Sequence, residues 1–138
     1  MDYGIRRSVK LPFDKAVEKT KAALSAEGFG VLSEIDMQVK LKEKLGVDTK
    51  KYLILGACNP PLAYSAISAD PSVGLLLPCN VTVESVSEQR TIVRLTNPEA
   101  LLATASLGPS LELAGVARDA GERMARAATA LKQTSDKA

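Results

Sequence analysis

The stretch YLILGACNPP, residues 52–61, decides the fold. Its first six residues form a continuous apolar run, which is typical of a central strand buried on both faces. The run ends at Cys58, and Asn59 and Pro60 follow it. Asn is a strong helix N-cap, and Pro is favoured at the first helical position. The stretch therefore predicts a buried strand that leads directly into a helix.

The segments on either side alternate between strand-like and helix-like patterns. They predict strands at residues 3–11, 29–37, 81–86 and 91–95, and helices at 13–28, 38–45, 60–70 and 109–132. We therefore expect a single α+β domain over residues 1–138, with residues 133–138 as a frayed tail.

Two of these segments carry specific side-chain patterns. In the strand at 29–37, alternation predicts that the apolar residues and the carboxylates lie on opposite faces, with Phe29, Val31 and Ile35 against Glu34 and Asp36. The last helix is expected to present a stripe of mostly small residues: Leu111, Ala114, Ala117, Gly121, Met124, Ala128 and Leu131. Small side chains let such a helix lie close to a sheet or to a partner helix.

Composition excludes several classes of protein. The chain has 138 residues, of which 46% are hydrophobic and 25% charged, as in an ordinary globular protein. A net charge of +2 with 4% aromatic residues argues against nucleic acid as a partner. No apolar run is long enough for a membrane helix and no secretory signal opens the chain, so we expect a cytoplasmic protein with reduced cysteines. The absence of histidine excludes His-based catalysis.

The two Cys-Asn dipeptides carry the most distinctive chemistry. Cys58 is expected just before a helix N-terminus, where the helix dipole favours a reactive thiolate; the alternative is a small buried residue at a strand end. Cys79 enters an alternating strand on its apolar face, which favours burial in the core. A disulfide between them requires Cα atoms within about 7 Å, and a reducing cytosol disfavours a permanent one.

Four polar residues complete the candidate site. Asn59 and Asn80 could donate hydrogen bonds to a ligand, although an N-cap and a turn or strand entry explain them equally well. Asp36 and Glu34 could serve acid-base chemistry or bind a cation, and Asp36 is the favoured one of the two; a solvated strand face is the alternative. Two cysteines alone do not make a structural zinc site, so no metal is expected.

Three blocks of sequence together resemble the domain-of-unknown-function 302 family. The blocks are Gly28-Phe29-Gly30-Val31 with Glu34-Ile35-Asp36, Leu55-Gly56-Ala57-Cys58-Asn59-Pro60, and Gly74-Leu75-Leu76-Leu77-Pro78-Cys79-Asn80. The resemblance covers nearly the whole chain. It implies a compact α+β fold with one antiparallel sheet of about four to six strands covered by helices, similar to half of the TATA-binding protein. It also implies a homodimer, and it implies no reaction, cofactor or substrate.

Two hypotheses for function remain open at this point. In the first, the two Cys-Asn motifs build a small-molecule or thiol-linked redox site, with Cys58 as the reactive group. In the second, the protein is a homodimeric interaction module without chemistry, which associates through its last helix or an edge strand, and the motifs only cap and turn the chain. Whether the protein is an enzyme is left undecided.

Overall fold

The computed structural model describes residues 3–104 and 111–131. Five strands in this part form one antiparallel sheet in the order β1-β5-β4-β3-β2. The strands are β1 (Gly4–Val9), β2 (Gly30–Asp36), β3 (Tyr52–Cys58), β4 (Cys79–Ser87) and β5 (Arg90–Thr96). The helices are α1 (Phe13–Ala26), α2 (Met37–Leu45), α3 (Pro60–Ala69), the 3-10 helix η1 (Pro71–Leu76), α4 (Pro98–Thr104) and α5 (Leu111–Ala130). The expected α+β class is confirmed, whereas the predicted helix start at Pro109 and the tail at 133–138 lie outside the described residues.

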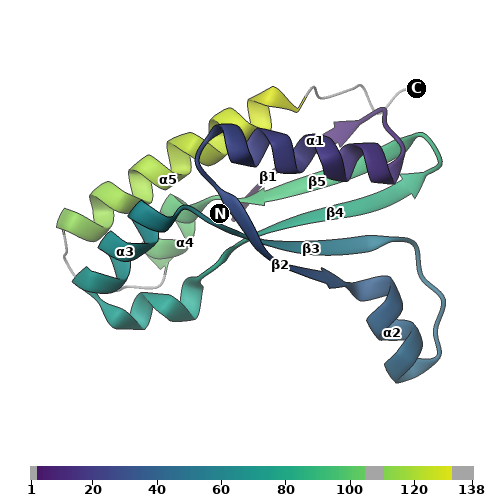
Figure 1. The fold of residues 1–138 in the computed structure, drawn as a ribbon, viewed down its shortest axis with the longest axis horizontal. Helices are drawn as coiled ribbons and strands as arrows, with labels where there is room; N and C mark the ends of the chain where they lie inside the picture. The colour runs from purple at the N-terminus through teal and green to yellow at the C-terminus, as the bar shows by residue number, and fades with distance from the viewer. Residues whose placement is uncertain (1–2, 105–110, 132–138) are drawn as a thin grey trace.

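Helices α1 and α5 cover one face of the sheet (Figure 1). The strand register brings aliphatic side chains together on this face, where Leu55 pairs with Val81 and Val81 pairs with Leu95. All three are fully buried, in one cluster with Leu24 of α1 and Met124 of α5. The main hydrophobic core therefore lies between these two helices and the sheet.

The opposite face of the sheet, here called the open face, keeps much of its surface exposed. Arg6, Arg94, Thr82, Ile54 and Ile35 form a row across the five strands on this face. Arg6 and Arg94 are exposed, Ile35 is 44% exposed, and the other two are half-buried. The apolar run at 52–57 is an internal strand, as expected, but its burial on both faces is wrong at Ile54, because that side chain lies on the open face.

A β-bulge reverses the faces of β2. The register shifts between Val31 and Ser33, so Leu32 is an extra residue with no place in the ladder. Val31 packs against the main core, whereas Ile35 pairs with Ile54 on the open face. The prediction that Val31 and Ile35 share a face is therefore wrong, since one extra residue inverts the alternation beyond it.

The small-residue face of α5 is covered by the protein itself. Its buried residues begin at Leu113 and continue through Ala117 to Met124 and beyond, packing against α1, α3 and α4. The predicted stripe is wrong in the first turn, because Leu111 is 93% exposed and Ala114 is also exposed. The small residues bring α5 close to the chain's own helices, so this stripe is not an open surface for a partner.

Candidate functional site

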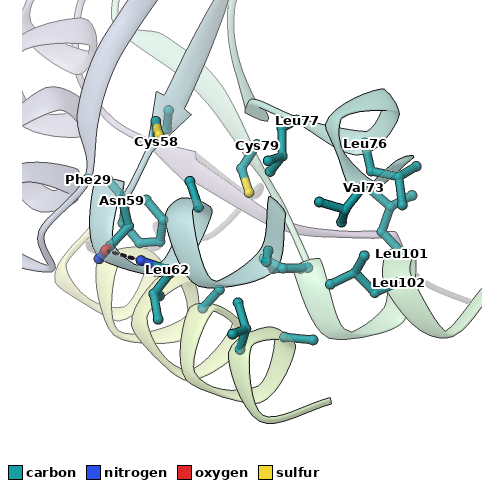
Figure 2. Close-up of a pocket in the computed structure, with 17 residues that line it drawn as sticks. Phe29, Cys58, Asn59, Leu62, Val73, Leu76, Leu77, Cys79, Leu101 and Leu102 are labelled. Atoms are coloured by element: carbon teal, nitrogen blue, oxygen red, sulfur yellow. Dashed lines mark hydrogen bonds between the residues drawn. The ribbon is translucent and has the colours of Figure 1, made fainter. Parts of the chain in front are cut away.

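An apolar cavity lies where the end of β3 meets α3, η1, α4 and α5 (Figure 2). Its volume is about 50 Å³. Most of its lining is aliphatic or aromatic carbon, contributed by residues that include Phe29, Leu62, Ala66, Val73, Leu77, Leu102 and Val116. This space exceeds what one water molecule needs, but a buried water also requires two to four polar partners, which such walls do not offer. The cavity is therefore suited to an apolar guest.

One wall of the cavity depends on a turn that the sequence patterns missed. The chain leaves α3 at Asp70 and enters η1 directly, and the Asp70 carboxylate accepts hydrogen bonds from the backbone N–H of Ser72 at 3.0 Å and its hydroxyl at 2.7 Å. The next segment, Leu77-Pro78, contains a cis peptide bond and leads into β4. This path buries Val73 in a small cluster with Ala66 and brings the start of β4 to the cavity.

Cys79 lines the cavity as the first residue of β4. It pairs with Ala57 of β3 on the helix-covered face and is 9% exposed, so the predicted burial of Cys79 is confirmed. Figure 2 shows its thiol pointing toward the surrounding aliphatic side chains. Burial raises the pKa of this thiol from 9.0 to about 11, with a further contribution from charge on Cys58. At neutral pH Cys79 is thus an uncharged, weakly polar thiol and a poor nucleophile.

Cys58 and Asn59 lie where β3 passes into α3, as predicted. Cys58 is half-buried at the end of the strand, and both cysteines are free thiols. Asn59 is the N-cap of α3: its side-chain oxygen accepts a hydrogen bond from the backbone N–H of Leu62 at 3.3 Å. Pro60 occupies the first helical turn. The sequence prediction of a strand that leads directly into a capped helix is therefore confirmed.

Asn59 also ties three helices together. Its amide nitrogen donates to the backbone carbonyl of Glu27, just after α1, at 3.4 Å, and the Arg123 guanidinium of α5 donates to the same oxygen at 3.1 Å. Gly28 has a left-handed backbone with φ of 85°, and a Cβ there would lie 2.9 Å from the Asn59 amide nitrogen. With its donor and acceptor both engaged and only 8% of its surface exposed, Asn59 is a structural clamp beside the cavity.

Gly56, two residues before Cys58, makes a close contact on the open face. A Cβ at Gly56 would lie 2.3 Å from the Ser33 hydroxyl and 2.8 Å from the ring of Pro78. Real Cβ atoms do not approach other atoms this closely, so residue 56 must be glycine for β2, β3 and the Pro78 turn to meet. The contact holds the start of β4, and with it Cys79, in place.

The remaining candidate residues lie away from the cavity. Asn80 follows Cys79 in the strand and is exposed, because alternation turns it to the open face. Asp36 is the N-cap of α2, where it accepts a hydrogen bond from the backbone N–H of Val39 at 3.1 Å. Glu34 forms an ion pair with Lys21 of α1. The structure thus brings Cys58, Asn59 and Cys79 together and leaves Asn80, Asp36 and Glu34 apart from them.

Neither a metal cluster nor a membrane span is found in residues 3–104 and 111–131. These ranges contain no group of three or more Cys, Asp or Glu side chains that could hold a metal ion. Within the same ranges, no helix combines the length and the apolar character needed to cross a bilayer.

Sequence patterns missed most of the cavity wall. Val73, Leu102 and Val116 come from three segments far apart in the chain, and each is an ordinary aliphatic residue with no local signal. The helix predicted at residues 60–70 ends at the dipeptide Asp70-Pro71, although Asp followed by Pro is also a typical start for the next helical turn. That signal could have revealed η1.

Comparison with known proteins places this chain in a family. No curated protein matches it. A crystal structure of an uncharacterised conserved DUF302 protein from Bacillus stearothermophilus has 26% sequence identity and a TM-score of 0.83, over 96% of this chain and 100% of the other. The model of the family described as domain of unknown function DUF302 matches residues 5–131, from β1 to the end of α5. The chain therefore belongs to the DUF302 family.

Proposed function

We propose that this protein binds a small apolar molecule in the cavity beside the two Cys-Asn motifs. The observation that carries the proposal is the apolar cavity of about 50 Å³, whose wall combines aliphatic side chains with the uncharged thiol of Cys79. Binding sites for small molecules are typically concave, mostly apolar and equipped with few polar groups, and this cavity shares those features. The expected cytoplasmic setting would keep the thiol reduced.

The geometry favours binding over thiol chemistry. A reactive cysteine needs a stabilised thiolate, whereas burial in apolar surroundings stabilises the neutral thiol of Cys79. Asn59, the amide that lines the cavity, already serves as a cap and a clamp: its oxygen accepts from Leu62 N–H and its nitrogen donates to the Glu27 carbonyl. Asp36 and Asn80, the other polar partners considered for such chemistry, are not part of the cavity lining.

Xenon provides a direct test, because it is apolar and small enough for this cavity. Methyl NMR spectra of the full chain are recorded under increasing xenon pressure. The expected result is a saturable shift of methyl groups that line the cavity, such as those of Leu62, Val73 and Leu102. A series of short n-alkanes then measures how far the cavity opens for a longer guest.

Two substitutions in α3 locate the binding site. Ala63 lines the cavity and is half-buried, so Ala63→Leu fills the space and is expected to abolish the saturable shifts. Ala69 lies on the same helix, is exposed and does not line the cavity, so Ala69→Leu is a matched control that keeps them. Methyl shifts that do not saturate, or that persist unchanged in Ala63→Leu, would contradict the proposal.

A homodimeric interaction module is the second candidate, and the free edge of β2 favours it. Among the residues that the structure describes, β2 pairs only with β3, and all its residues from Leu32 to Asp36 are exposed. Such an edge offers unpaired backbone groups to another strand. Light scattering of the full chain measures the oligomeric state. A dimer that Leu32→Pro converts to a monomer with unchanged circular dichroism would support association through this edge, and a monomer at all concentrations would exclude it.

A further inference from the structure

A second hollow lies on the opposite side of the sheet from the cavity. It is an open groove of about 600 Å³ between α2 and the open face. Met37 and Leu41 of α2 form one wall, while Tyr52 and Ile54 of β3 form the floor. The groove is thus an apolar trough at the surface of the protein.

Helix α2 keeps apolar side chains exposed. None of its nine residues is buried, and Figure 1 shows it projecting from the end of β2, away from α1 and α5. Val39 is 45% exposed and Leu45 is 69% exposed, and the neighbouring Ile35 and Val47 are 44% and 43% exposed. Helices this short gain most of their stability from tertiary packing, so a helix with no buried residue has capacity for a further contact.

The groove lies within a basic region of the molecule. The open face carries Arg6, Arg90 and Arg94 against Glu84, and residues 36–51 carry five lysines against three acidic residues. Together these surfaces hold eight of the 18 basic residues but four of the 16 acidic ones, a local charge of +4. Since the whole chain has a net charge of +2, the rest of the molecule carries −2.

The acidic residues of this region are engaged with the protein itself. Glu84 pairs with Arg94 at 2.7 Å, Asp48 pairs with Lys42 at 2.9 Å, and Glu43 pairs with Lys40 at 3.8 Å. The fourth acidic residue, Asp36, caps the N-terminus of α2.

The two lysines that border the groove have no carboxylate partner within residues 3–104 and 111–131. The ammonium of Lys50 donates to the backbone carbonyl of Val86 at 2.7 Å, and that of Lys51 lies 5.5 Å from the centre of the Phe13 ring. The Lys51 ammonium thus lies on the side of α1, and Lys50 is the cation that a ligand with carboxylates would meet at the edge of the trough.

We infer that this groove docks an acidic polypeptide segment that inserts an apolar side chain between α2 and β3. The apolar trough fits the inserted side chain, and Lys50 at its edge, within the basic region, fits a flanking carboxylate. A second copy of this chain would bring another surface of charge +4 against the first, which opposes association of two such faces. Nucleic acid is a disfavoured ligand. Proteins that bind single-stranded nucleic acid stack successive bases on several aromatic side chains, whereas the lining of this groove contains one, Tyr52.

The test uses the full chain and a fluorescently labelled probe peptide in which glutamates flank two leucines. Fluorescence anisotropy at about 0.1 M salt measures its affinity, where surface charges are partly screened. We expect saturable binding that weakens when glutamine replaces the glutamates and also when serine replaces the leucines. The double variant Lys50→Glu, Lys51→Glu is expected to lower the affinity by about tenfold or more, because it reverses the positive charge at the end of the trough. Leu41→Ser is also expected to lower the affinity, because it removes an apolar side chain from the wall of the trough.

A matched charge reversal separates local from general electrostatics. Lys15→Glu with Lys19→Glu makes the same change in net charge on exposed positions of α1, on the other side of the sheet, and should leave affinity within about twofold. The inference is overturned if the probe does not bind, or if both double variants weaken binding equally. It is also overturned if a single-stranded oligonucleotide binds more tightly than the peptide, or if the groove variants dissociate a dimer instead. The xenon response of the cavity is independent of all these results.

Discussion

The buried thiol of Cys79 should make the protein lose stability as the pH rises above 9. The folded-state pKa of this thiol is about 11, compared with an ordinary value of 9.0. Between these two values the unfolded chain has released the proton while the folded protein still holds it. Because the unfolded state binds fewer protons, the free energy of unfolding falls with increasing pH.

The size of this loss follows from the two pKa values. A shift from 9.0 to about 11 corresponds to about 2.7 kcal/mol once the pH exceeds both values. Most of it, about 2 kcal/mol, is expected between pH 8 and pH 10.5. Below pH 8 the thiol is protonated in both states and contributes no pH dependence.

Denaturant unfolding followed by circular dichroism measures this loss. Wild type and Cys79→Ala are compared at pH 8, 9.5 and 10.5 under reducing conditions, so that the titration of lysines and tyrosines cancels in the difference. The wild type should lose about 2 kcal/mol more than the variant between the lowest and highest pH. Cys58→Ala, which keeps the buried thiol, should behave nearly as the wild type does. Equal losses in wild type and Cys79→Ala would refute the burial argument.

Three further predictions concern Gly56 and Asn59, which hold the cavity in place, and Asp36, which lies away from it. Gly56→Ala should lower the free energy of unfolding by about 1–3 kcal/mol through overcrowding, and Ser33→Gly in the same chain should recover part of it, as a double-mutant cycle in urea would show. Asn59→Ala should cost about 1–2 kcal/mol in the same assay and raise hydrogen exchange in the first turn of α3, since the cap is lost. Asp36→Ala should cost about 1 kcal/mol at most and leave xenon binding unchanged, because it caps α2 away from the cavity; altered xenon shifts would speak against that separation.

Local patterns predicted much of the fold because they act within a few residues. The Asn59 cap and the Pro60 start depend on short-range backbone chemistry, and the structure has both where they were expected. The burial of Cys79 followed from simple alternation along β4. The same alternation turns Asn80 outward, so the Cys-Asn dipeptide could not place both side chains in one site.

The cavity could not be predicted, because it depends on how distant segments pack. Its walls come from α3, η1, α4 and α5, and a small void among such aliphatic side chains leaves no trace in the order of residues. The role of Glu34 was also hidden, since its ion pair with Lys21 depends on a single register shift earlier in β2.

Because Leu32 is an extra residue, side chains before and after it in β2 alternate between the two faces of the sheet in opposite order. The first half presents its apolar side to the core, whereas the second half sends Glu34 toward Lys21 on α1 and Ile35 to the open face. Removal of this one residue would bring the two halves into phase and exchange the inner and outer faces of everything from residue 33 to the start of α2. The presence of this one residue thus determines how the start of α2, and the groove beside it, are oriented relative to the two faces of the sheet.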